Sequence, residues 1–338
     1  MTQLKPFYSA FFITIIGIVA AVYLEPTHKL YALYLVIVLA LLEISLSFDN
    51  AVVNAKVLAR MPPKWQQLFI WIGLPIAVFG MRLVFPIFLV DMTTPLSFME
   101  VLHLAISKPD DYHYALMLGF PTICAFGGGF LIMVFLKFFA AEEHETQWIA
   151  WLENNRIVST LRSYPGGYIL LALIIGIIVI TNANPIHGVT LAVAFLAGLM
   201  IHEALGILDH LFGGNMASNV AKNGLMGFLY LEVLDASFSF DGVIGAFAIT
   251  TNIFMIMIGL GIGAMYVRSL TIFFVRHNTL AKFRYLEHGA HYAIGFLAIV
   301  MFIKIFTHVP EWLTGTVGIG LIVIAFIHST IANGRDRG

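Results

Sequence analysis

Ten apolar stretches of the length needed to cross a bilayer follow one another along the chain, and they constrain its fold most. A transmembrane helix needs about 20 predominantly apolar residues. Only 11% of the 338 residues are charged, whereas about 25% is usual in soluble domains. We therefore predict an all-α polytopic membrane protein in contact with lipid. The predicted spans are 7–24, 31–56, 67–90, 113–139, 167–182, 187–207, 223–250, 253–276, 289–307 and 312–330.

Two of these spans carry the same acidic motif. The pattern acid-x-Ser-hydrophobic-Ser-Phe-Asp begins at Glu43 and again at Asp235, 192 positions later. The motifs lie in the second and seventh spans, which cross the membrane in opposite directions if all ten spans alternate. We therefore predict an inverted internal repeat, an architecture found in many secondary transporters. The first half would be 1–163, with its motif at 42–54, and the second half 164–338, with its motif at 232–246.

The basic residues indicate an orientation. With ten alternating spans, thirteen of the eighteen Lys and Arg residues fall on the side that holds both termini, two fall on the opposite side, and three lie within spans. Positive charge in short loops marks the cytoplasmic side. We therefore expect both termini in the cytoplasm, with the protein in a plasma membrane of the bacterial inner-membrane type. The first apolar run is longer than the core of a signal peptide, so we expect it to be the first span, with cleavage after Ala20 or Ala21 as the alternative.

Side chains that carry oxygen gather on one face of each motif helix. Spacings of three and four residues place them in one narrow stripe, because each residue turns a helix by about 100°. The first stripe contains Glu43, Ser47, Asn50 and Asn54, and the second contains Glu232, Asp235, Ser239 and Gly242. If the stripes meet, they present carboxylates, hydroxyls and amides. Hard divalent cations such as manganese, magnesium and calcium prefer these ligands. We therefore predict a metal site within the membrane.

The second acid of each motif does not fall on its stripe. Asp49 and Asp241 each follow the first acid by six residues, which is about 240° around an ideal helix. Either these two side chains face another helix, or the helix unwinds locally, as the broken helices of transporters do. We include both Asp residues among the predicted metal ligands.

Three basic residues lie within the predicted spans, and five acids outnumber them. Arg82 and Arg268 are expected either to pair with the acids of the motifs or to extend toward the membrane surface near a helix end. Lys304 is a candidate to compete with the cation for a carboxylate. The alternative is that the acids only bridge helices or neutralise these bases. A bound cation would balance the remaining negative charge, and pairing alone would not.

The motif regions resemble the TerC family of membrane proteins, which belongs to the LysE transporter superfamily. The first pattern of that family, Leu-Glu-x-x-Leu-Ser-x-Asp-Asn-Ala, is matched from Leu42. The second is matched at Glu232, Asp235 and Asp241 and by the Phe-Ala-Ile-Thr run at 247–250.

The similar regions are 35–90 and 225–305. The chain departs from the family in its long connection over 140–165, in Gly242 where Ser is frequent, and in Gly245 where Pro is frequent. The resemblance implies export of a divalent metal, manganese above all, with a link to tellurite resistance.

We therefore expect a secondary transporter that exports a divalent cation in exchange for protons, because carboxylates that repel one another take up protons readily. The cation would be a substrate, and no cofactor is expected. The alternative from another class is a non-transporting scaffold or assembly factor in a metal-stress complex. Enzymatic activity is not expected, since the motif serines lack a nearby His or Lys base in their own spans. A net charge of −1 without a basic block gives no indication of nucleic acid binding.

Overall fold

The structure is a computed structural model, and it describes residues 2–94, 96–141, 146–164, 166–183, 188–213, 224–247, 249–250, 252–277 and 279–335. Over these ranges the regular elements are all helices, which confirms the predicted all-α class. The chain forms two compact units. One contains Met1–Phe120 and Ala217–His277, and the other contains Pro121–Met216 and Asn278–Gly338. The two sequence halves, which describe the repeat, remain a prediction.

The first unit begins with η1 (Thr2–Phe7), α1 (Tyr8–Leu24), α2 (Lys29–Leu46), α3 (Phe48–Arg60), α4 (Pro63–Trp71), α5 (Gly73–Pro75), η2 (Ile76–Val84), α6 (Phe85–Thr93) and α7 (Phe98–Ser107). It also holds α13 (Gly224–Phe247) and α14 (Ile253–Arg276). Helix α8 (Pro109–Leu136) belongs to the first unit up to Phe120. The second unit continues with η3 (Lys137–Ala141), α9 (Ala150–Glu153), α10 (Arg156–Ser163), α11 (Gly167–Asn182), α12 (Gly188–Gly213), α15 (Thr279–Lys282), α16 (Leu286–Lys304) and α17 (Glu311–Arg335).

Seven helical segments in the described ranges are long and apolar enough to cross a membrane, which supports a multi-pass membrane protein. They are Lys5–Leu24, Lys29–Leu46, Pro109–Ala140, Gly188–Ile207, Ile253–Arg276, Leu286–Lys304 and Gly315–Gly334. Three shorter apolar helices cover Ile76–Phe88, Phe98–Ser107 and Gly167–Asn182. All ten predicted spans contain helix. The helix over Phe98–Ser107 was not predicted, because its ten residues are fewer than a span requires.

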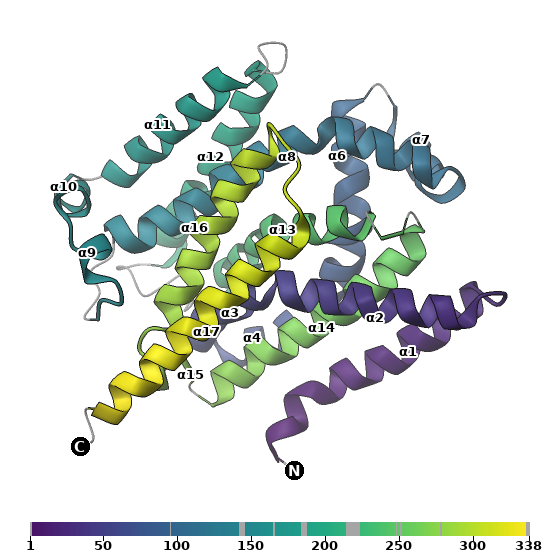
Figure 1. The fold of residues 1–338 in the computed structure, drawn as a ribbon, viewed down its shortest axis with the longest axis horizontal. Helices are drawn as coiled ribbons and strands as arrows, with labels where there is room; N and C mark the ends of the chain where they lie inside the picture. The colour runs from purple at the N-terminus through teal and green to yellow at the C-terminus, as the bar shows by residue number, and fades with distance from the viewer. Residues whose placement is uncertain are drawn as a thin grey trace. The chain divides into compact units, whose positions relative to one another are not determined.

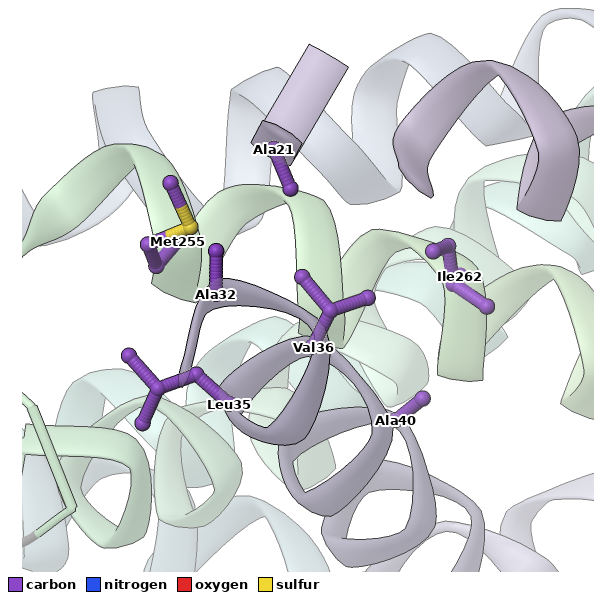
Figure 2. Packing of buried hydrophobic residues seen from close by; sticks show 7 residues of the cluster. All are labelled: Ala21, Ala32, Leu35, Val36, Ala40, Met255 and Ile262. Carbon is purple, nitrogen blue, oxygen red and sulfur yellow. The ribbon is translucent and has the colours of Figure 1, made fainter. Parts of the chain in front are cut away.

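Small residues allow two helices of the first unit to approach closely. Helices α1, α2 and α14 lie side by side (Figure 1). Figure 2 shows Ala32 and Val36 of α2 packed with Met255 of α14. Farther along α14, a Cβ atom on Gly263 would lie 2.5 Å from the Glu43 Cβ. Small residues at helix interfaces permit this approach in membranes, so the packing brings the backbone of α14 against the first motif acid.

The first motif helix is interrupted in the middle of its motif. Helix α2 ends at Leu46 and α3 begins at Phe48, while Ser47 between them has φ −108° and ψ 15°. The Ser47 N–H still donates to the Glu43 carbonyl at 2.9 Å, so the break is a kink of one residue. Helix α13 is continuous across the second motif. Local unwinding at Gly242, which we considered at the sequence level, is therefore wrong.

The third predicted span is divided into α4, α5, η2 and α6. Pro75 and Pro86 lie on either side of η2, and neither has an N–H to donate within a helix. The nine residues of η2 form a π-helix, in which backbone bonds join positions five apart. Such segments are rare and occur frequently at functional sites. This π-helix carries the buried Arg82.

Candidate ion site

Glu43 and Arg82 form a buried ion pair in the first unit. Both side chains are at most 2% exposed, and Arg82 Nη2 lies 2.5 Å from Glu43 Oε1. The same carboxylate oxygen accepts a hydrogen bond from Ser47 Oγ at 3.0 Å. Arg82 Nη1 also donates to the Ala77 carbonyl within η2. Ser47, at the kink, therefore donates to Glu43 Oε1, and the π-helix holds the arginine that donates to the same oxygen.

Arg268 makes the corresponding pair with the second motif. Its Nη2 lies 3.0 Å from Asp235 Oδ2 and 3.3 Å from Glu232 Oε1. Its Nη1 donates to the Phe69 carbonyl at 2.8 Å, and its guanidinium lies 4.4 Å from the centre of the Phe69 ring. This arginine therefore joins α4, α13 and α14. The predicted pairing of both arginines with motif acids is confirmed, and neither arginine extends to a surface.

Asn50 connects the two motifs directly. Its Nδ2 donates to Asp235 Oδ1 at 2.7 Å, across 185 positions of sequence. Asn50 is fully buried, and Asp235 is 8% exposed. The two motif faces therefore meet within the first unit.

Three oxygen atoms at this meeting point are buried without a hydrogen-bond donor among the described residues. They are Glu43 Oε2, Asn50 Oδ1 and Asn54 Oδ1. Leaving a buried acceptor unsatisfied costs about 1–3 kcal/mol. Native structures therefore contain few such atoms, and each requires an explanation. A cation that accepts oxygen ligands would satisfy all three.

The buried charges in the described part of the first unit do not cancel. The buried acids are Glu43, Asp49, Glu232 and Asp235, and the buried bases are Arg82 and Arg268. Asp49 lies in the first turn of α3, where its Oδ1 accepts the Asn50 N–H at 3.0 Å. Because charge inside a membrane is expensive, an excess of two acids favours a positively charged ligand.

Some predicted site residues stay untested. The side chains of Ser239 and Asp241 lie outside those that the structure describes, although their backbone belongs to α13. Lys304 is buried in α16 and belongs to the second unit. Within the described residues, no three Asp, Glu, His or Cys side chains form a group able to hold a metal ion. A cation site built from the described side chains would therefore need neutral oxygens as well, such as the amide oxygens of Asn50 and Asn54.

The second unit contains two polar clusters that we did not predict. Glu203 accepts a hydrogen bond from Tyr168 at 3.1 Å and lies 3.1 Å from His202 Nδ1. Glu153 accepts bonds from the backbone N–H groups of 148 and 149 and, at 3.0 Å, from the Tyr292 hydroxyl. Both carboxylates are surrounded by donors from their own unit, which favours structural roles for them.

A comparison with known proteins finds a matching family model. A family model described as a protein of unknown function (DUF475) matches residues 48–336. Curated proteins of Shigella flexneri and Escherichia coli (strain K12), named "Putative membrane-bound redox modulator Alx", are 29% identical over 128 residues. The match covers 34% of this chain and 38% of each relative. No solved structure matches.

Proposed function

The chain belongs to the DUF475 family, and on this premise we propose that it is a secondary transporter of the TerC type that exports a divalent metal cation, manganese foremost, in exchange for protons. The observation that carries the proposal is the set of three buried oxygen atoms without donors where the two motifs meet. Oxygen atoms of carboxylates and amides are the ligands that hard divalent cations accept. The site would lie at the interface of an inverted repeat, with both termini in the cytoplasm.

The buried acids supply the charge for such an exchange. Three of them contact an arginine, namely Glu43, Glu232 and Asp235, and carboxylates gathered in this way repel one another. Binding a divalent cation would relieve this repulsion, and protons could replace the cation when it leaves. Export coupled to proton uptake then needs only that the acids meet each side of the membrane in turn.

The experiment is manganese flux into inside-out proteoliposomes under an imposed pH gradient, followed with a manganese-sensitive dye. We expect flux with the unchanged protein and loss of most flux in an Asp49→Asn, Asp241→Asn double variant, which keeps side-chain shape and removes two charges. Asp111→Asn is the matched control, because that side chain is 65% exposed. Full flux in a well-folded double variant would show that these carboxylates are not the metal site. Competition by magnesium, calcium and zinc measures selectivity.

A non-transporting role is the second candidate, and the name of the relatives gives it one form, a membrane-bound redox modulator. The chain contains a single cysteine, Cys124. One cysteine cannot form a disulfide within the chain, so thiol exchange would require a second molecule. Folded protein that shows no flux of any divalent cation would favour this candidate over the transporter.

A further inference from the structure

The two motif carboxylates that we place in the ion site are equivalent in sequence and share one half of their environment. Glu43 and Asp235 are 192 positions apart, the offset of the whole motif. Each gives one oxygen to an arginine, Glu43 Oε1 to Arg82 at 2.5 Å and Asp235 Oδ2 to Arg268 at 3.0 Å. Because an arginine contacts both carboxylates, this interaction does not explain how the two differ.

The second oxygen of each carboxylate has a different environment. Asp235 Oδ1 accepts a hydrogen bond from Asn50 Nδ2 at 2.7 Å. Glu43 Oε2 is buried and accepts no hydrogen bond from any residue that the structure describes. One carboxylate is thus satisfied on both oxygens, whereas its equivalent has one oxygen ready for a ligand.

One sequence difference between the repeats lies directly beside these second oxygens. The position equivalent to Asn50, 192 residues later, is Gly242. A Cβ atom on Gly242 would lie 2.8 Å from Glu43 Oε2. Position 242 therefore faces Glu43 as position 50 faces Asp235, but glycine has no amide to donate. The exchange of Asn for Gly leaves Glu43 Oε2 open.

From this asymmetry we propose that Glu43 Oε2 is the carboxylate oxygen that binds a hard divalent cation, with Asn50 Oδ1 and Asn54 Oδ1 as neutral ligands. This inference rests on the proposed function and assigns the roles within it. Asp235 is a positioning residue, because it holds the Asn50 amide through Nδ2 and so turns Oδ1 away from itself. Gly242 determines which of the two equivalent carboxylates is free to coordinate.

The test is manganese binding to the purified full chain, measured by the loss of the free Mn²⁺ paramagnetic resonance signal. Gly242→Asn places an amide donor beside Glu43 Oε2 without changing any charge. We expect its affinity for Mn²⁺ to fall by about tenfold or more, since a hydrogen bond to a charged group is worth about 1.5–3 kcal/mol. Gly242→Ala adds a Cβ atom 2.8 Å from Glu43 Oε2 but no donor, so we expect it to keep more affinity for Mn²⁺ than Gly242→Asn does.

Gly80→Ala is the matched control, because its Cβ would lie 3.5 Å from Ile76 and away from the acids. Wild-type affinity in folded Gly242→Asn would overturn the inference, and so would a folded Gly242→Ala variant that binds as weakly as Gly242→Asn. If Gly242→Asn does not fold, Glu43→Gln, which keeps the side-chain shape and removes the charge from Glu43 Oε2, takes its place with the same expected loss. A wild-type protein that binds no Mn²⁺ would instead refute the proposed function, so the two failures are distinguishable.

Discussion

Removing Arg82 should destabilise the protein far more than removing Arg82 and Glu43 together. The Arg82→Met substitution leaves the Glu43 carboxylate, 2% exposed, without its counter-charge. Breaking a buried ion pair from one side costs about 3–5 kcal/mol, whereas replacing both partners is often close to neutral. We therefore expect a loss of about 3–5 kcal/mol for Arg82→Met and recovery of at least half of it in Arg82→Met with Glu43→Gln.

The assay is reversible chemical unfolding in lipid–detergent bicelles, followed by the fluorescence of the five tryptophans. Lys108→Met is the control, because Lys108 and Asp111 form a pair 4.0 Å apart in which both side chains are more than 60% exposed. Such surface pairs contribute little, so no measurable change is expected. A double variant as unstable as Arg82→Met would refute the reasoning, since the cost would then not come from an unpaired carboxylate.

Three further predictions concern single positions. Gly263→Ala should lower the free energy of unfolding by about 1–3 kcal/mol, because its Cβ would meet backbone and side-chain atoms of α2. Gly80→Ala should not lower it, and the same unfolding assay measures both variants. Asn54→Leu should leave the free energy of unfolding unchanged or raise it, because it removes a buried acceptor that has no donor. The same substitution should weaken Mn²⁺ binding, and unaltered binding would exclude Asn54 as a ligand. The Ser97 N–H and hydroxyl donate to Glu100 at the start of α7 and lower the pKa of its carboxyl. The Ser97 amide should therefore be protected from hydrogen exchange above the usual carboxyl range, and this protection should be lost as the pH falls through the lowered pKa. Glu100→Gln should abolish this pH dependence.

Hydrophobic length predicted most helices but not their internal breaks. The predicted spans 167–182 and 253–276 coincide with α11 and α14, because apolar runs between polar ends define a membrane helix by themselves. Apolar length does not place the kink at Ser47, which lies within the motif where local unwinding was one of the two alternatives. The extent of the π-helix likewise depends on tertiary contacts, although the two prolines beside it indicate a disturbance.

The sequence predicted most of the residues of the candidate site but only some of the contacts between them. The repeated acids and the stripe from Glu43 to Asn54 follow from sequence spacing alone. The bond from Asn50 to Asp235 joins helices far apart in sequence, so only the folded chain shows it. The closely approaching glycines of α14 were a missed signal, because Gly259 and Gly263 are spaced as small residues at membrane helix contacts are.

The π-helix over Ile76–Val84 connects backbone winding to the charge next to Glu43. A π-helix holds more residues in each turn than an α-helix does. Rewinding η2 into α geometry would therefore rotate every side chain beyond the rewound turn about the helix axis. Arg82 lies near the end of η2, seven positions beyond Pro75, so it would swing away from Glu43 without any change in covalent structure. The π-helical winding of this one segment is therefore what places Arg82 beside the first motif acid.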